Sequence, residues 1–311
     1  MPIKERNLDS GLRAKIEMAS LGMALSPNGN VAYVDSGNAA AGTTAKGTGD
    51  PTNPYSTILA AQDALSANNG DVGIVMPGHA ETISNATAMA LNKAGITWVG
   101  IGRGSDRPTI TFDNASGNIP ISANNVTLSN FLITTSGTID VTIGVTVTGN
   151  DVLLHEVELI EGGTTSQFVV GIHASTMLGG LIQDCKFLGY AGDATVTAIR
   201  MSGSDRLEIT GCSLVGNFQG SADATGAIQS LTTLNVDIDI HHNRVENRDG
   251  TSEAGLVFVS TDTGFAYENF IAVPTGDFGQ GVVADNAMRQ YNNYVVDVAQ
   301  ERGAPEGTAS A

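Results

Sequence analysis

From residue 126 onward the chain repeats itself at an interval that few folds can accommodate. A first set of alternating apolar segments begins at residues 126, 152, 180, 207, 238, 264 and 288. A second set, led by Gly or Ala, begins at residues 144, 171, 198, 227, 255 and 281. Two independent sets sharing a period of about 27 residues, built of strands and turns, predict a solenoid of parallel β coils. Leucine-rich repeats have a similar period, but their regular Leu ladder is absent here.

One position inside the first set is occupied by small or amide side chains. It follows the residue expected to form the turn, and its occupants are Cys185, Cys212, Asn243, Asn269 and Asn293. If successive coils stack about 4.8 Å apart, these side chains form a column. Asn residues in such a column can hydrogen-bond to one another and to the neighbouring backbone. We expect the two cysteines to be buried, reduced neighbours.

The charge balance excludes several classes of function. The formal net charge is -17, with 15 Lys and Arg against 32 Asp and Glu. A nucleic-acid-binding protein needs a basic surface, and an anionic membrane would repel this chain. No apolar run is long enough to cross a membrane, and no signal-peptide core is recognisable. We therefore expect a protein that folds in the cytoplasm and binds neither nucleic acid nor membrane.

The predicted domain order is simple. Residues 1–30 form a helical arm whose apolar face repeats at helical spacing through Leu8, Leu12, Ile16 and Met23. This face can dock either on the body of the protein or on a partner subunit. Residues 31–300 form the solenoid, with a helix at about 55–68, and residues 301–311 are expected to be a flexible tail.

The segment from Tyr55 to Ile83 resembles the entry to pectate-lyase-like β-helices. In those proteins a capping helix with a Thr-Ile start is followed by a Gly-Asp strand and a Pro-Gly turn. The matching residues here are Thr57, Ile58, Ala61, Ala64, Leu65, Gly70, Asp71, Ile74, Met76, Pro77, Gly78 and Glu81. His79 and Ala80 depart from the pattern. The resemblance implies an all-β, right-handed parallel β-helix, a fold that carries both enzymes and inert viral proteins.

The order of arm and solenoid, with a strongly acidic composition, also resembles tailed-phage head decoration, cement and spike proteins. That resemblance implies a structural protein of the virion, assembled in the host cytoplasm and displayed on the capsid surface of a bacteriophage. It further implies a homotrimer attached to the major capsid protein. Its partner-binding arm would use Leu8, Leu12, Ile16 and Met23.

The alternative function is a polysaccharide-active, tailspike-like enzyme (a lyase or glycosidase), or a carbohydrate-binding module without turnover. Its candidate catalytic residues are Glu208, Asp237, Asp239 and His241, which the repeat places on outward positions. Asp237 and Asp239 would lie on one strand, roughly 6.5–7 Å apart at Cα, a separation that suits an inverting glycosidase. The same carboxylates could instead hold Ca²⁺ or form a solvated acidic face.

Catalytic motifs known from β-helix enzymes are missing. Neither the Ca²⁺-binding Asp set of pectate lyases nor the polygalacturonase motifs are found. His241 and His242 are adjacent, so on a strand they would face opposite ways and could not share a metal. We therefore expect a protein that is not an enzyme and that needs no cofactor and no metal.

Aromatic residues concentrate on the last coils. Five fall on predicted outward positions: Phe265, Tyr267, Phe270, Tyr291 and Tyr294. Exposed aromatic clusters mark contact surfaces. A subunit interface around a threefold axis is the preferred interpretation. A platform on which a surface glycan stacks, or a patch covered by the tail, are the alternatives.

Overall fold

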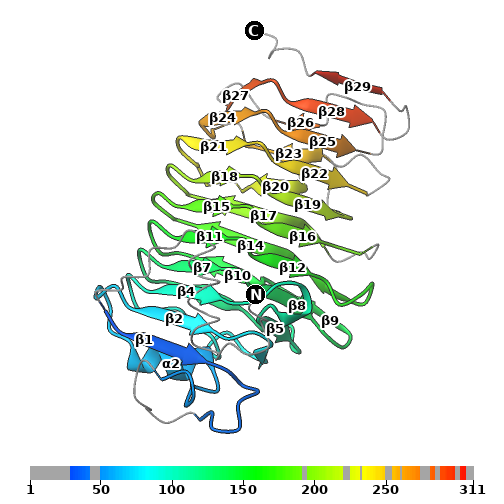
Figure 1. Cartoon of the computed structure of the whole chain (residues 1–311). Coiled ribbons are helices and arrows are strands. Elements are labelled where there is room, and N and C mark those ends of the chain that lie inside the picture. Colours follow the sequence, from blue (N-terminus) through cyan, green and yellow to red (C-terminus); the bar gives the residue numbers. More distant parts are fainter. Residues whose placement is uncertain are drawn as a thin grey trace, which may run out of the picture.

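The computed structural model is a rod of stacked β coils (Figure 1). It describes residues 29–42, 50–190, 195–219, 225–231, 233–248, 254–259, 261–273, 281–283, 288–297 and the strand 302–305. Two ten-stranded sheets and one seven-stranded sheet run along the rod, and nearly every pairing is parallel. The predicted all-β, right-handed parallel β-helix is therefore confirmed.

The three sheets are here named A, B and C. Sheet A consists of β1 (Val31–Val34), β2 (Val72–Val75), β4 (Thr97–Gly100), β7 (Thr127–Ser129), β11 (Leu153–His155), β15 (Leu181–Gln183), β18 (Glu208–Thr210), β21 (Ile238–His241), β24 (Gly264–Tyr267) and β27 (Met288–Tyr291). Sheet B consists of β3 (Ala80–Ile83), β5 (Thr109–Phe112), β8 (Leu132–Thr135), β12 (Glu158–Ile160), β16 (Lys186–Leu188), β19 (Ser213–Gly216), β22 (Arg244–Asn247), β25 (Phe270–Val273), β28 (Tyr294–Asp297) and β29 (Arg302–Pro305).

Sheet C consists of β6 (Ile119–Ile121), β10 (Val145–Val147), β14 (Val170–Ser175), β17 (Thr197–Ser202), β20 (Gly226–Ser230), β23 (Ala254–Val257) and β26 (Val282–Val283). The short strands β9 (Ile139–Val141) and β13 (Ser166–Phe168) pair with each other outside the three sheets. The first set of sequence repeats supplies sheets A and B, and the second set supplies sheet C. Both predicted sets are thus confirmed.

Apolar side chains from all three sheets fill the interior of the rod. Ile182, Ile209 and Ile240 are register partners on successive strands of sheet A, and each is at most 1% exposed. A run of phenylalanine rings lies along the core, with the first two contacts edge-on and the third tilted and with centroids 6.0, 6.3 and 5.6 Å apart, through Phe112, Phe168, Phe187 and Phe218. Burying each such side chain stabilises the fold by about 1.5–3 kcal/mol, and stacking is what buries it.

From β7 onward, a tight turn joins sheet A to sheet B in each coil. One residue of each turn has positive φ, and this position is held by Asn130, Glu156, Asp184, Gly211, His242, Glu268 and Asn292. The next residue points inward, which buries Cys185 and Cys212 as free thiols and stacks the three asparagines, as predicted. Burial raises the pKa of the Cys185 thiol well above its ordinary value.

The stacked asparagines form a continuous chain of hydrogen bonds. Asn293 Oδ1 accepts from the Asn269 backbone N–H at 3.1 Å, and Asn269 Oδ1 accepts from that of Asn243 at 3.0 Å. Asn243 Oδ1 accepts from the Cys212 N–H at 2.9 Å. Their amide groups also donate to backbone carbonyls of the preceding coil. The column therefore satisfies buried backbone groups at the sharpest bend of each coil.

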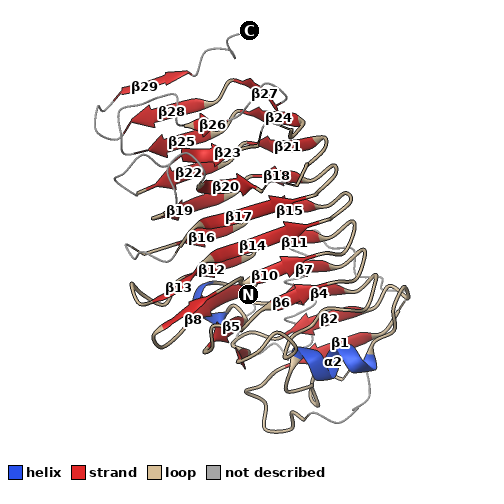
Figure 2. Ribbon diagram, turned by 180° about the vertical axis from the view of Figure 1, so that it is seen from behind, coloured by secondary structure: helices blue, strands red, loops and turns tan. Residues whose placement is uncertain are grey.

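The predicted capping helix is α2 (Ile58–Ala64), which packs against β1 and β2 at the N-terminal end of the rod (Figure 2). The Thr57 hydroxyl accepts from the Ala60 N–H as its N-cap, and Glu81 accepts from the Ile58 N–H at 3.0 Å. His79, which departs from the family pattern, is fully buried and lies 3.3 Å from Glu81. A short 3-10 turn, η2 (Gly104–Asp106), is the other helical element described.

The sequence analysis expected a helical arm at the N-terminus and a flexible tail at the C-terminus. The expected arm, with Leu8, Leu12, Ile16 and Met23, lies outside the described residues. Arg302–Pro305, expected to belong to a flexible tail, forms strand β29 and pairs antiparallel with β28. The physical reason is that β28 is the last coil strand of sheet B, so its outer edge offers unpaired backbone groups to any strand that reaches it.

Glu161 is a carboxylate buried where sheet B leads into the following loop, and it is 1% exposed. It accepts hydrogen bonds from the backbone of Phe168 and Tyr190 and from the Thr195 hydroxyl. Burial, the largest effect, raises its pKa above the ordinary 4.5, although these hydrogen bonds act in the opposite direction. Ionised Glu161 is therefore disfavoured in the folded state.

We expect Glu161→Gln to change how stability depends on pH. Because the folded-state pKa is raised, the contribution of Glu161 is complete below the unfolded pKa and is lost as pH rises through the folded pKa. Glutamine cannot ionise, so the variant should gain stability relative to the wild type as pH rises across that range. Urea unfolding at a series of pH values measures this. The prediction is contradicted if the free energy of unfolding depends on pH in the same way in both proteins. It is also contradicted if the Glu156→Gln control changes that dependence as Glu161→Gln does.

We expect Asn269→Ala to destabilise the rod by about 3 kcal/mol, because Asn243 and Ile240 of the preceding coil and Asn293 of the following coil lose hydrogen bonds. Lys186→Ala, at an exposed position of β16, is the matched control and should shift the urea midpoint little. A variant at Asn269 that unfolds at the wild-type urea concentration would show that the column contributes no stability.

Candidate functional site

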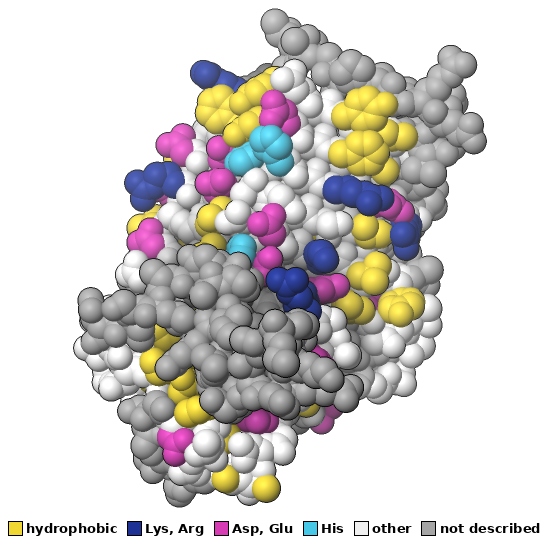
Figure 3. Space-filling view, viewed as in Figure 1, with side chains coloured by type: hydrophobic (Ala, Val, Ile, Leu, Met, Phe, Trp, Pro, Cys, Tyr) yellow, Lys and Arg dark blue, Asp and Glu magenta, His cyan; other side chains and the backbone are white. Residues whose placement is uncertain are grey.

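The outward face of sheet A, over its last four strands, gathers the chemically active side chains. Strand register defines two rows on this face. Glu208, Asp239, Phe265 and Arg289 are partners in one row, and Thr210, His241, Tyr267 and Tyr291 are partners in the other. Acidic, imidazole and hydrophobic side chains accordingly cluster over these coils in the space-filling view (Figure 3). We name these eight residues the sheet A site.

Three flat rings stack along the second row. The rings of His241 and Tyr267 are 4.8 Å apart and 11° from parallel, and those of Tyr267 and Tyr291 are 4.7 Å apart and 7° from parallel. These separations match the spacing between coils, so the backbone itself sets the stack. Phe265 flanks it with its ring edge-on to Tyr291, and the Arg289 guanidinium lies 5.8 Å from the Phe265 centroid. The result is an aromatic column that runs along the rod.

Two carboxylates lie beside the column on adjacent strands. Glu208 and Asp239 are register partners, and Glu208 Oε1 lies 3.1 Å from His241 Nε2. Burial raises the pKa of Asp239 and the charge of Glu208 raises it further, whereas His241 and a hydrogen bond from Tyr267 act to lower it. Asp239 Oδ1 is buried and has no hydrogen-bond partner among the described residues. Asp239 thus holds a proton more readily than an ordinary aspartate.

Asp237 lies elsewhere than the sequence analysis placed it. It precedes β21 with φ of +50°, in the left-handed region, and its N–H donates to the Thr263 hydroxyl. The expected pair of carboxylates two residues apart on one strand is therefore replaced by Glu208 and Asp239 on neighbouring strands. The physical reason is that the coil bends at Asp237, where the regular alternation of a strand does not hold.

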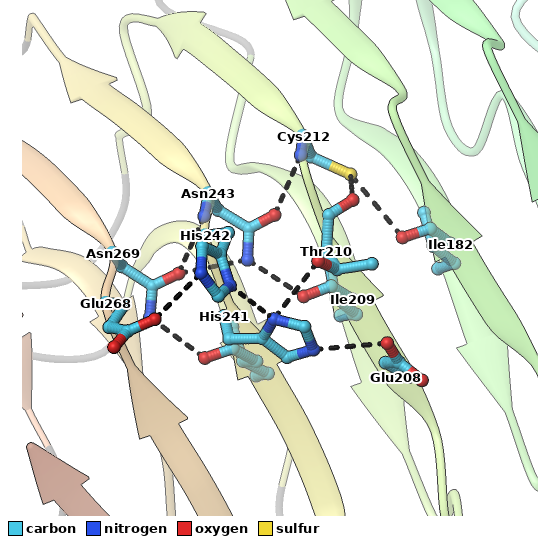
Figure 4. Close-up of polar contacts among 11 residues, drawn as sticks. Ile182, Glu208, Ile209, Thr210, Cys212, His241, His242, Asn243, Glu268 and Asn269 are labelled. Atoms are coloured by element: carbon cyan, nitrogen blue, oxygen red, sulfur yellow. Dashed lines mark hydrogen bonds and ion pairs between the residues drawn. The ribbon is translucent and has the colours of Figure 1, made fainter.

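The two adjacent histidines face each other, so the expectation that they point in opposite directions is wrong (Figure 4). Strand β21 ends at His241, and His242 takes the left-handed turn position with φ of +55°. Their Nδ1 atoms are 2.7 Å apart, and His242 Nε2 lies 2.7 Å from Glu268. Aligning the turn position across repeats, as Asn130, Glu156, Asp184, Gly211, His242 and Glu268, would have revealed this bend from sequence.

The five expected interface aromatics form two patches. Phe265, Tyr267 and Tyr291 belong to the sheet A site, whereas Phe270 and Tyr294 stack on sheet B with centroids 5.6 Å apart. The tight turn between sheets A and B separates them. Phe265, Phe270, Tyr291 and Tyr294 are each 40–44% exposed, so the expected outward orientation is found. Their use as a subunit interface stays a prediction.

Within the part of the chain that the structure describes, no three His, Cys, Asp or Glu side chains come together in a way that could hold a metal ion. Among the same residues, no helix is long and apolar enough to cross a membrane.

We expect Tyr267→Phe to raise the pKa of Asp239 further, because the substitution removes a hydrogen bond that stabilises the ionised carboxylate. Carboxyl NMR titration of protein labelled with ¹³C-aspartate measures the shift. Tyr294→Phe, on sheet B, is the control and should leave the titration of Asp239 unchanged. A pKa of Asp239 that stays constant or falls in Tyr267→Phe would show that the hydroxyl does not stabilise the carboxylate.

Comparison with known proteins supports the fold and little beyond it. No protein-family model matches the chain. No curated protein matches it either. A solved structure named rhamnogalacturonan lyase aligns over 85% of this chain and 87% of its own, with a TM-score of 0.41 and 12% sequence identity. At that identity the likeness concerns the β-helix fold alone.

This match corrects one expectation of the sequence analysis. The chain was expected not to be an enzyme, and the structure that it resembles bears the name of a polysaccharide lyase, so that expectation is withdrawn. The resemblance to pectate-lyase-like β-helices stands at the level of fold. No finding supports the resemblance to phage decoration, cement or spike proteins. The protein is a parallel β-helix whose sheet A carries acidic, imidazole and aromatic side chains on its outward face.

Proposed function

We propose that this protein is polysaccharide-active and that it binds and cleaves a glycan chain across the sheet A site. The observation that carries this proposal is the exposed aromatic column placed directly beside two carboxylates, one of which has a raised pKa. The column supplies binding, and the carboxylates supply acid–base chemistry.

The shape of the column favours a polymer over a small ligand. Its rings repeat at 4.8 and 4.7 Å along the rod, so they present an extended flat surface and not an enclosed pocket. Tyr291 is 44% exposed and Phe265 is 41% exposed, which leaves ring surface open to a ligand. Aromatic rings with a few placed polar groups are the usual lining of ligand sites, and the apolar faces of sugar rings pack on such surfaces.

The carboxylates match the requirements of glycosidic bond cleavage. A general acid needs a carboxyl group that keeps its proton near neutral pH, and the raised pKa of Asp239 favours that role. Glu208, held by His241, supplies the second carboxylate. Register partners on adjacent strands are about 4.8 Å apart at the backbone, so the two carboxyl groups are near enough to act on one glycosidic bond.

Attachment to a major capsid protein, a homotrimeric state and a location on the capsid surface stay predictions. Attachment rests on the arm in residues 1–30, and the homotrimer rests on the aromatic residues of the last coils. Phe265, Tyr267 and Tyr291 belong to the sheet A site, so a subunit interface built on them would compete with glycan binding.

We expect Asp239→Asn to abolish cleavage while leaving binding intact, and Tyr291→Ala to weaken binding. Loss of a general acid typically costs about 10²–10⁴-fold in rate. The measurement uses a panel of neutral, uronate-containing and amino-sugar polysaccharides. Binding is followed by affinity electrophoresis. Cleavage is followed by reducing-end release and by ultraviolet absorbance of unsaturated products.

Asp151→Asn is the matched control, because Asp151 is an exposed carboxylate in a left-handed turn just before β11 of the same sheet. Its cleavage rate should equal that of the wild type. The proposal fails if the wild-type protein binds no member of the panel, or if Asp239→Asn cleaves a bound polysaccharide at the wild-type rate.

A further inference from the structure

The contact between His241 and His242 imposes a definite count of protons. Each Nε2 faces a carboxylate, since His241 lies 3.1 Å from Glu208 and His242 lies 2.7 Å from Glu268. Both Nε2 atoms therefore carry hydrogen and donate it. If both rings were neutral, both Nδ1 atoms would present lone pairs to each other at 2.7 Å. One additional proton between them turns that repulsion into a charge-assisted hydrogen bond.

The ring geometry fits a straight N–H···N bond. Two imidazole radii of about 1.1 Å, added to the 2.7 Å between the Nδ1 atoms, nearly reproduce the observed centroid separation of 5.0 Å. The two nitrogens thus lie close to the line between the ring centres. A metal ion bound by both nitrogens would need them angled toward a third point, which would bring the centroids closer together.

The neighbours indicate which ring holds the proton. His241 is 15% exposed, and its Nδ1 also lies 3.2 Å from the Thr210 hydroxyl, which can donate to it. A hydroxyl donor at this distance favours the form of His241 whose Nδ1 carries no hydrogen, so this nitrogen is assigned as the acceptor. His242 is 58% exposed and has the shorter contact to a carboxylate, so it is the better place for the positive charge.

We propose that His242 is a positioning residue: it carries a proton that it shares with His241 Nδ1, and this bond holds the His241 ring flat against Tyr267 in the aromatic column. The inference deepens the proposed function and rests on it, because the column is the proposed glycan-binding surface. The backbone sets the spacing of the stack, and the bond to His242, together with the contacts to Glu208 and Thr210, fixes the orientation of the His241 ring within it.

Acceptors and carboxylates surround the pair. The groups that face it are Glu208 on β18, Asp239 on β21, Tyr267 and Glu268 on β24 and its turn, and Tyr291 on β27. Among the described residues, none of these neighbours is a cation. The surroundings therefore favour an arrangement in which the two rings share a proton.

The shared proton can be observed directly in full-length protein labelled with ¹⁵N-histidine, which has only five histidines. We expect a scalar coupling between the two Nδ1 nuclei, which arises only across an N–H···N hydrogen bond. The coupling should disappear in His242→Ala. If the folded wild-type protein shows no such coupling at every pH measured from mildly acidic to neutral, the proposal is overturned.

Binding to the best polysaccharide of the panel tests the positioning role. His242→Ala should bind about five- to tenfold more weakly, because one ring of the column is no longer held. His242→Gln keeps an N–H donor at this position, so it should restore binding to near the wild-type level. A His242→Gln protein that binds as weakly as His242→Ala would overturn the role assigned to His242.

His155→Ala is the matched control. His155 lies on β11 of the same face, with its Nδ1 3.1 Å from the Ser129 hydroxyl, and no second imidazole touches it. This variant should retain both the coupling and the wild-type affinity. If no polysaccharide binds, the proposed function and the positioning role both fail. The coupling still decides by itself whether the two histidines share a proton.

Discussion

Parallel backbone pairing between successive coils is the constraint on which the rest of this structure depends. Each strand is hydrogen-bonded to the equivalent strand one coil before and one coil after, in unbroken register along three sheets. Equivalent side chains are therefore held one coil spacing apart. Strand register alone is therefore enough to line up similar residues in columns. Examples are the isoleucines and phenylalanines of the core, the asparagines of the turn and the rings of the outer face.

The same register brings side chains from separate coils together in the sheet A site. A tyrosine on β24 and another on β27 become a stack because they share a register position, and Glu208 meets Asp239 for the same reason. The coil also brings together residues that a flat strand would keep apart. The left-handed turn after β21 rotates His242 to face His241, and it places Glu268 of the next coil behind His242.

Burial then gives this surface its chemical character. Asp239 is shielded enough for its pKa to rise, while the neighbouring carboxylate adds to the effect. The raised pKa of Asp239 therefore has a local origin, in burial first and in the charge of Glu208 on the adjacent strand after it.

The repeat period by itself determined the fold, the order of the sheets and the inward column of Cys185, Cys212, Asn243, Asn269 and Asn293, because stacking leaves one way to bury such a pattern. It also placed Glu208, Asp239, His241 and the aromatics on the outer face. The sequence could not determine the direction of side chains at bends. Alternation holds only within a strand, so Asp237 and His242 were misplaced, and only the tertiary structure showed that backbone curvature pairs the two histidines and separates the aromatics into two patches.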